Sequence, residues 1–154
     1  MSYNKLMINY YYATLKVEAI TKLNNFKTGC WVDVESPSDQ EKEQLVDLGL
    51  DESLINDAFD IHEVPRLEVA KGNFYFFART PVKDPSQANL PTAPILVVIA
   101  NKGVFSLSRK DLHSIWQPLL NDASVATTQK TKLFILLVNR ITTEYRDSLN
   151  LIYK

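Results

Sequence analysis

The sequence predicts one α/β domain followed by a long C-terminal helix. Three observations predict it: β-rich runs occur in pairs around short turns, amphipathic helical patterns fill the stretches between them, and one uninterrupted helical pattern closes the chain. The 154 residues are 45% hydrophobic and 23% charged, the balance of a single globular domain. We therefore assign residues 1–127 to the α/β domain and residues 128–154 to the helix.

Two hairpins are expected where turn residues separate β-rich runs. The residues KGN at 71–73 lie between RLEVA and FYFFAR, and NKG at 101–103 lie between PILVVIA and VFSLS. Two further strands are expected at Thr14–Ala19 and Trp31–Val34. The stretch PVKDPSQANLPTAP at 81–94 contains four prolines, so we expect an exposed loop there and not a central strand.

A first helix is expected to begin within the sequence SPSDQE. Either Ser36 is the N-cap with Pro37 at the first helical position, or Ser38 is the N-cap and forms a capping box with Glu41. Gly49 is expected to end this helix. Its buried side is expected to consist of apolar residues: Leu45, Val46 and Leu48.

A second helix is expected from about Asp51 to Ile61, because Pro65 forces the chain out of helical geometry. Its apolar and polar residues fall on opposite arcs at 100° per residue. The apolar arc carries Leu54, Ile55, Ala58 and Phe59, and the polar arc carries Glu52, Ser53, Asn56, Asp57 and Asp60.

Two more helices are expected in the last third of the chain. One begins near Asp111, and Pro118 is expected to kink or shorten it; its apolar residues are Leu112, Ile115, Trp116 and Leu119. The other occupies 128–154, which at about 27 residues is roughly 40 Å long. Its apolar stripe is Leu133, Leu137, Ile141, Tyr145, Leu149 and Ile152. This helix is expected to project from the domain, and it has no stop signal before the last residue.

Charge and hydropathy exclude several classes of protein. The net charge of −1 gives no reason to expect a nucleic acid as partner. The longest apolar runs have 6 residues, too few to span a membrane, and the N-terminus has no signal peptide, so a cytosolic location is expected. A single cysteine, Cys30, cannot build a disulfide framework and is expected to be buried.

The acidic residues are concentrated in one part of the chain. Residues 33–68 hold 12 acids against Lys42 and Arg66, a charge of −10, so the remainder carries +9. Such a run is typical of a solvated helical face, and it also suits a hard cation such as Mg²⁺, which one or two carboxylates can hold. A zinc site at Asp60, His62 and Glu63 lacks the usual paired spacing.

The order of motifs resembles the cytosolic N-terminal domain of the CorA family of magnesium transporters. The matching residues are GCWVDV at 29–34, SPSDQE at 36–41, LINDAFD at 54–60, EVPRLE at 63–68, and KTKLFILL at 130–137 continuing through Arg140 and Tyr145. The resemblance implies a mixed β-sheet flanked by helices, with residues 128–154 as the start of a stalk helix. It also implies a fragment, because that family's two transmembrane helices and Gly-Met-Asn signature are missing from the sequence.

The resemblance further implies a function without catalytic residues. The family's cytosolic domains lie under the membrane as a homopentamer and bind regulatory divalent cations between protomers. The family's sensor aspartate matches Asp57, and a second site in some members corresponds to Asn56 and Asn139, whose amides bring no charge. With the neighbouring Asp60, this makes Asp57, Asn56 and Asp60 the candidate metal residues. Mg²⁺ is the expected cation, and Co²⁺ and Ni²⁺ are alternative cargo.

Two other functions stay open on the sequence alone. A stand-alone cytosolic interaction module would use the long helix to bind a partner protein. A metal-dependent hydrolase would use Asp57, Asp60 and Glu63, and clustered carboxylates are its only support.

Overall fold

The computed structural model describes residues 7–15, 19–82, 91–109 and 112–152. In these residues seven strands form one sheet with the order β2-β1-β3-β7-β6-β5-β4. The strands are β1 (Ile8–Tyr12), β2 (Thr21–Leu23), β3 (Cys30–Glu35), β4 (Arg66–Ala70), β5 (Asn73–Pro81), β6 (Thr92–Ala100) and β7 (Gly103–Ser108). The helices are α1 (Asp39–Asp47), α2 (Glu52–Asp57), η1 (His113–Trp116), α3 (Gln117–Leu120) and α4 (Lys130–Ile152).

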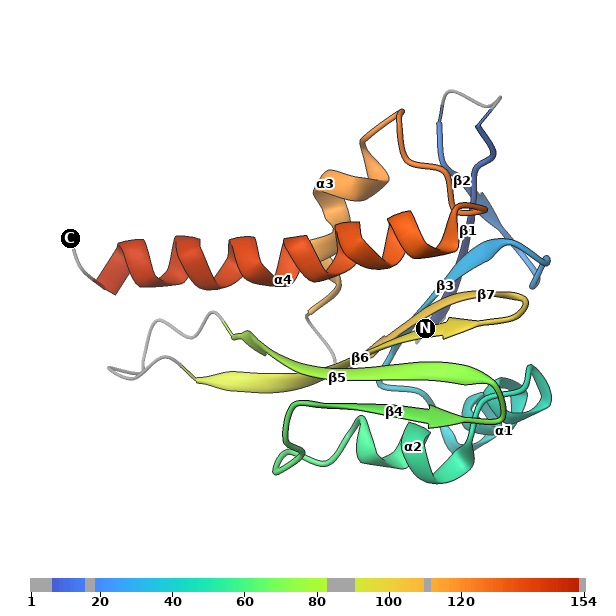
Figure 1. Cartoon of the computed structure of the whole chain (residues 1–154), viewed down its shortest axis with the longest axis horizontal. Helices are drawn as coiled ribbons and strands as arrows, with labels where there is room; N and C mark the ends of the chain where they lie inside the picture. The colour runs from blue at the N-terminus through green and yellow to red at the C-terminus, as the bar shows by residue number, and fades with distance from the viewer. Residues whose placement is uncertain (1–6, 16–18, 83–90, 110–111, 153–154) are drawn as a thin grey trace, which may run out of the picture.

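The sheet is mixed, as predicted, and lies between two layers of helices. β3 and β7 pair in parallel, and the other neighbouring strands pair antiparallel. Figure 1 shows α1 and α2 on one face and α3 and α4 on the other. Each face has its own apolar core, one around Val32, Leu54 and Phe77, the other around Trp31, Trp116 and Leu137. The expected α/β fold class is confirmed.

Both predicted hairpins are present. β4 and β5 are joined by Lys71 and Gly72, whose φ angles of 53° and 79° are the positive values that a tight two-residue turn needs. The β6–β7 hairpin pairs Ala100 with Gly103. A Cβ on Gly103 would lie 2.5 Å from the backbone oxygen of Cys30, so only glycine allows β7 to approach β3 here.

The expectation of a loop over the whole of 81–94 is wrong at both of its ends. β5 continues to Pro81, and β6 begins at Thr92 and contains Pro94. The pairing of β6 with β7 starts only at Ile95, so β6 pairs on one side alone at Pro94 and tolerates the missing N–H there. Residues 83–90, the middle of the predicted loop, lie outside the described residues.

The predicted strand at Thr14–Ala19 is also wrong in the part that the structure describes. Thr14 and Leu15 are not in a strand, Leu15 is 72% exposed, and residues 16–18 lie outside the described residues. Instead β1 and β2 flank this segment and pair with each other. The tyrosine-rich run INYYY of β1 carried the signal, because aromatic residues favour strands. The strand expected at Trp31–Val34 is confirmed as β3.

The first two helices begin where the sequence signals are strongest. Ser38 is the N-cap of α1: its Oγ accepts from the Glu41 N–H at 3.2 Å, and Glu41 Oε1 accepts from the Ser38 N–H at 3.0 Å. Asp51 caps α2, which ends at Asp57 and not at Ile61 as predicted. Asp60 Oδ1 accepts from the His62 N–H, a local bond that competes with further helix.

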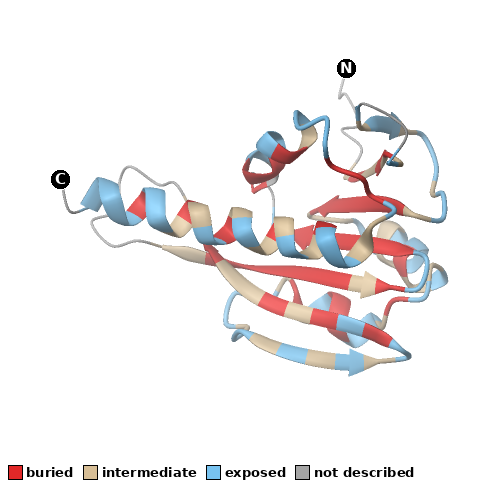
Figure 2. Ribbon diagram, turned by 45° about the horizontal axis from the view of Figure 1, so that its top comes forward, coloured by how far each residue is buried: buried red, intermediate tan, exposed pale blue. Residues whose placement is uncertain are grey.

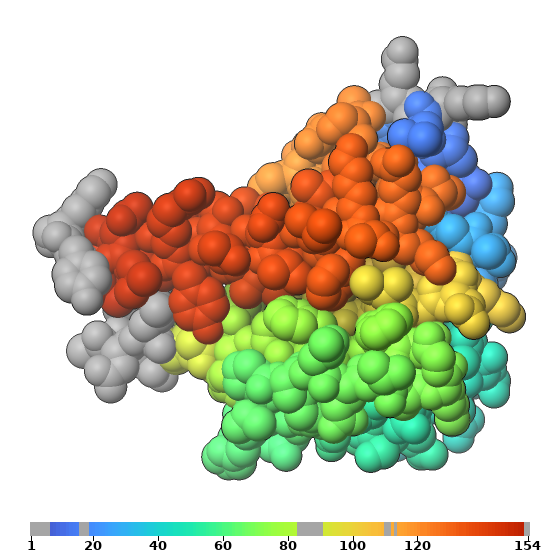
Figure 3. All heavy atoms as spheres, viewed as in Figure 1, coloured from blue at the N-terminus to red at the C-terminus, as the bar shows by residue number. Residues whose placement is uncertain are grey.

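The helical pattern near Pro118 is confirmed as two short pieces, η1 and α3, with Pro118 in the first turn of α3. Asp111, where this helix was expected to begin, lies outside the described residues. α4 covers β5, β6 and β7 along its first turns, where Leu133, Leu137 and Ile141 are buried (Figure 2). Figure 3 shows α4 lying along the sheet beside β5.

The far end of α4 leaves apolar side chains exposed, in line with the expected projection. Leu149 and Ile152 are 42% and 51% exposed. Glu144, which lies off the predicted stripe, is buried instead and forms an ion pair with Arg140 at 3.0 Å. Arg140 also donates to the Ile115 carbonyl, which joins α4 to η1.

Two acids of the 33–68 run do not belong to an acidic surface. Asp33 and Glu35 are buried on the α4 side of the sheet. Trp31 Nε1 donates to Ser106 Oγ at 2.8 Å, and Ser106 Oγ donates to Asp33 Oδ1 at 2.7 Å. Burial, followed by the charges of Asp33 and Glu35, raises the pKa of Tyr11 to about 12.

Gly103→Ala is expected to destabilise the protein by about 3 kcal/mol, because the added methyl group would overlap the Cys30 backbone. Gly72→Ala has open space but keeps a positive φ, so it is expected to cost about 1 kcal/mol. Urea unfolding of both variants measures the difference. Equal losses would contradict the close approach of β7 to β3.

Tyr11→Phe is expected to reduce the decrease in the free energy of unfolding that occurs at alkaline pH. The folded state holds the Tyr11 proton more tightly than the unfolded chain does, so this contribution is complete below the ordinary pKa of 10.0 and is lost as pH rises to about 12. Chemical denaturation across this interval compares variant and wild type, with neutral pH as the reference. Parallel curves between these two pH values would show that Tyr11 titrates normally.

Candidate cation-binding site

The three candidate metal residues lie at the end of α2 and in the turn that follows it. Asn56 and Asp57 are the last two residues of the helix, and Asp60 comes three residues later. β5 holds the start of this segment, because the Asp51 N–H donates to Tyr75 Oη at 2.9 Å and Asn73 Nδ2 donates to the Gly49 carbonyl at 3.1 Å. The segment therefore rests on a rigid strand and not on a free loop.

β5 also holds the exit from α2. Arg79 Nη1 donates to the carbonyls of Ile61 and Glu63, at 3.1 and 2.9 Å. Its Nη2 and Nε donate to the backbone carbonyl and Oγ1 of Thr92, both at 2.8 Å. One guanidinium thus fixes the turn after α2 against β6, and this contact sets the position of Asp60 and Glu63.

Asp57 forms an ion pair with Arg66, the first residue of β4. Arg66 Nη2 donates to Asp57 Oδ2 at 2.9 Å, and the Asp57 side chain is 37% exposed. Oδ1 of Asp57 receives no hydrogen bond from the residues that the structure describes. One oxygen of this carboxylate is therefore engaged, and the other is open to a ligand.

Arg66 is shared among three carboxylates. Its Nη1 pairs with Glu63 Oε1, and its Nε donates to Glu68 Oε1 at 3.0 Å. The guanidinium carbon lies 4.1 Å from the centre of the Phe77 ring, a cation–π contact with β5. Asp57, Glu63 and Glu68 bring three negative charges to one positive charge, so this cluster carries −2.

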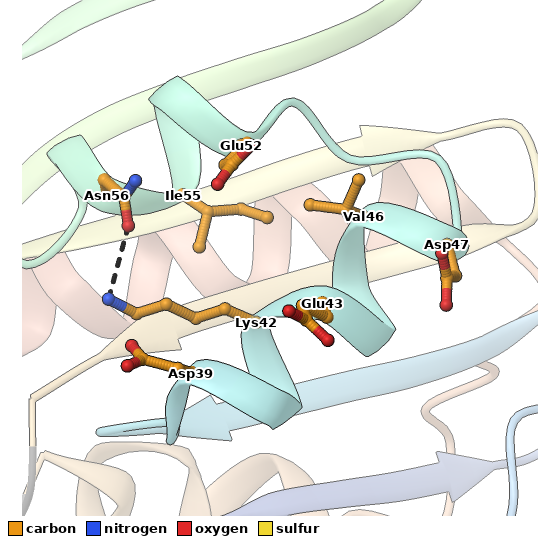
Figure 4. Close-up of a pocket in the computed structure, with 8 residues that line it drawn as sticks. All are labelled: Asp39, Lys42, Glu43, Val46, Asp47, Glu52, Ile55 and Asn56. Atoms are coloured by element: carbon orange, nitrogen blue, oxygen red, sulfur yellow. Dashed lines mark hydrogen bonds between the residues drawn. The ribbon is translucent and has the colours of Figure 1, made fainter.

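Asn56 lies in a separate groove between α1 and α2, which Figure 4 shows in close-up. Lys42 Nζ donates to Asn56 Oδ1 at 3.2 Å across this groove. The groove has a volume of about 430 Å³ and is lined by Asp39, Lys42, Glu43, Val46, Asp47, Glu52, Ile55 and Asn56. The amide oxygen of Asn56 therefore already faces a cation, the lysine ammonium.

The structure does not bring Asn56, Asp57 and Asp60 to one point. Asn56 faces Lys42, Asp57 faces Arg66, and Asp60 accepts from the His62 backbone. Within the described part of the chain, no group of three or more His, Cys, Asp or Glu side chains could hold a metal ion. Asn139, the other amide of the second family site, is exposed on α4, across the sheet from Asn56.

Lys42, Arg66 and Glu68 are charged partners that the sequence did not assign to this site, whereas Glu63 was considered only for a hydrolase or a zinc site. The alternation of Arg66 and Glu68 with Leu67 and Val69 does signal a strand with one charged face. Nothing in the sequence pairs Arg66 with Asp57, which lies nine residues away on another element.

Cys30 is completely buried in β3, as expected, and burial raises the pKa of its thiol. None of the helices in the described ranges is long and apolar enough to cross a membrane. Arg66 lies between Asp57 and Glu63, and Asp60 bonds to the backbone, so these three carboxylates do not converge as the hydrolase hypothesis requires.

The fold of this chain is similar to the folds of several proteins with solved structures. The soluble domain of CorA from Methanocaldococcus jannaschii has a TM-score of 0.74 and 19% identity, covering 94% of this chain and 59% of that chain. The complete CorA magnesium transporter of the same organism has a TM-score of 0.69 and 18% identity, covering 96% and 48%. The ZntB cytoplasmic domain from Vibrio parahaemolyticus has a TM-score of 0.68 and 12% identity, covering 94% and 61%.

The family follows from the sequence match. The model of the CorA-like Mg²⁺ transporter protein family matches residues 26–154, so the chain belongs to this family. No curated protein sequence matches the chain. The chain spans 59% of the solved soluble domain and 48% of the complete transporter. The resemblance seen in the sequence motifs is confirmed.

Arg79→Met is expected to destabilise the protein by about 2 kcal/mol, because it removes four hydrogen bonds that join the α2 exit to β5 and β6. Lys42→Met is the matched control: it removes one exposed hydrogen bond and a distant cation–π contact with Phe59 at 5.5 Å, and it is expected to cost less than about 0.5 kcal/mol. Urea unfolding compares the two. Equal small losses would show that Arg79 does not hold the turn.

Proposed function

We propose that this chain is the cytosolic regulatory domain of a CorA-like divalent cation transport protein and that it binds Mg²⁺ between protomers to gate the pore. The match of the family model to residues 26–154 carries this proposal. In the proposed protein, residues 1–127 form the cytoplasmic domain and residues 128–154 begin the stalk helix. The domain acts by binding and not by catalysis.

Asp57 is the proposed sensor residue. Its carboxylate is part-exposed, its Oδ1 is open, and its cluster carries a charge of −2, which one divalent cation would neutralise. Mg²⁺ keeps several waters and needs only one or two protein carboxylates, so the second carboxylate can come from a neighbouring copy. Asn56 and Asp60 are proposed as flanking polar groups that contribute through bound water.

The electrostatic repulsion between carboxylates of neighbouring protomers is large enough to drive a two-state switch between a closed and an open pore. Two carboxylates about 5 Å apart repel by roughly 1 to 3 kcal/mol at effective dielectric constants of 80 to 20. Over the interfaces of a pentamer the sum is roughly 5 to 15 kcal/mol. About 5.5 kcal/mol moves a two-state equilibrium from 1:99 to 99:1. A bridging Mg²⁺ that cancels this repulsion can therefore hold the closed state, and its loss can release it.

The proposed assembly places the domain on the cytoplasmic side of the cell membrane. The complete CorA transporter shares this fold in a chain of which the present one covers 48%. The exposed apolar residues at the end of α4, Leu149, Leu151 and Ile152, fit a helix that meets neighbouring helices beneath the pore. The same residues fit a stand-alone interaction module, which a stable partner protein would reveal.

Asp57→Ala in the full-length transporter is expected to raise the Mg²⁺ concentration that closes the pore by about tenfold, because one of the few charged ligands is lost. Mg²⁺-dependent current or uptake in membranes measures this concentration. Glu52→Ala is the matched control, since it removes an exposed carboxylate from the same helix. Unchanged closing in Asp57→Ala, or an equal change in Glu52→Ala, would exclude Asp57 as the sensor.

A further inference from the structure

Arg66 uses each nitrogen of its guanidinium on a different carboxylate. Nη2 contacts Asp57, Nη1 contacts Glu63 and Nε contacts Glu68. Asp57 is thus the proposed ligand of the cation and also a present partner of Arg66. A divalent cation at Asp57 and the Arg66 guanidinium must share one carboxylate, and like charges repel at this range.

We propose that Arg66 is a resident counter-ion that competes with the divalent cation for Asp57 and thereby sets the affinity of the site. When the cation binds, Arg66 releases Asp57 and stays with Glu63 and Glu68. This inference rests on the proposed function, because it describes how the same site is tuned. It assigns Arg66 a positioning role, since the residue itself does not bind the cation.

The surroundings of Arg66 keep the free-energy cost of this exchange low. After it releases Asp57, the guanidinium keeps two carboxylate partners and its contact with the Phe77 ring at 4.1 Å. Glu63 is the most buried of the three carboxylates, with an 11% exposed side chain, so it is the firmest of the remaining anchors. The Asp57 side chain is 37% exposed, so an ion can reach it from solvent. No charge is left buried and unpaired at any stage.

The charge of this cluster also determines the direction in which Arg66 changes the affinity for the cation. With Arg66 in place, the charge of −2 attracts a dication less strongly than the −3 of the carboxylates alone would. Arg66 therefore keeps the affinity low, so that the site empties when the cation concentration falls. The three carboxylates are held apart by the guanidinium, in agreement with the lack of a three-carboxylate metal site in the described residues.

The first experiment uses the wild-type chain, so it does not depend on a variant that must fold. Mg²⁺ is added to the isotope-labelled chain at constant ionic strength, and NMR follows the Asp57 backbone amide and the Arg66 Nε–Hε group. Both signals are expected to move with the same half-saturating concentration. An Asp57 signal that moves while the Arg66 signal stays fixed would overturn the competition.

The second experiment compares charge variants at the same position. Arg66→Gln is expected to lower the half-saturating Mg²⁺ concentration about tenfold, because a positive charge about 5 Å from the dication is removed at a part-exposed site. Arg66→Lys keeps the charge and is expected to stay near the wild type. Arg146→Gln is the matched control, because it removes an exposed arginine from α4 and is expected to change nothing.

Asp57→Asn separates the failure of this inference from the failure of the proposed function. If Asp57→Asn leaves Mg²⁺ binding unchanged, the proposed sensor residue is wrong. If Asp57→Asn weakens binding and Arg66→Gln does not tighten it, only the competition by Arg66 is overturned. An equal tightening in Arg66→Lys and Arg66→Gln would also overturn it, since the effect would then not come from charge.

Discussion

The parallel pairing of β3 with β7 is the constraint on which the rest of this structure depends. Every residue of both strands is buried, and the pair joins the first quarter of the chain to its last third. One face of the pair packs under α1 and α2, and the other packs under α3 and α4. Because Gly103 lies so close to the Cys30 carbonyl, a side chain at this one position would separate the strands and loosen both cores.

β5, a strand of the same sheet, holds the segments of the candidate site in place. Tyr75 and Asn73 hold the segment that enters α2, and Arg79 holds the segment that leaves it. Phe77, from the same strand, supports the Arg66 guanidinium. Asp57 and Arg66 are therefore placed by four side chains of one strand, which is a more exact means of positioning charges than a surface loop provides.

The fold places nine of the twelve acids of residues 33–68 in three environments, and the other three, Glu41, Asp51 and Asp60, accept hydrogen bonds from nearby backbone N–H groups. Asp33 and Glu35 are buried on the α4 side of the sheet, four carboxylates line the groove between α1 and α2, and Asp57, Glu63 and Glu68 surround Arg66. The two basic residues of the run, Lys42 and Arg66, each meet one of the candidate metal residues. The sequence suggests one acidic face, but in the folded molecule the acidic residues form separate clusters whose charge is partly neutralised.

The sequence by itself determined the local features: a helix start within SPSDQE, the tight turn at Gly72, the buried face of α2, and the motif order that indicates the family. These signals act between residues that are close in the chain. Only the tertiary structure decided that α2 stops at Asp57, that Pro94 lies in a strand, and that Arg66 pairs with Asp57. The end of α2 combines the local bond between Asp60 and the His62 N–H with the Arg79 side chain of β5, which binds the carbonyls that follow. The other two features depend on another element, since Pro94 lies before the point where β7 begins to pair and Arg66 belongs to β4, and no local pattern specifies which distant groups will meet.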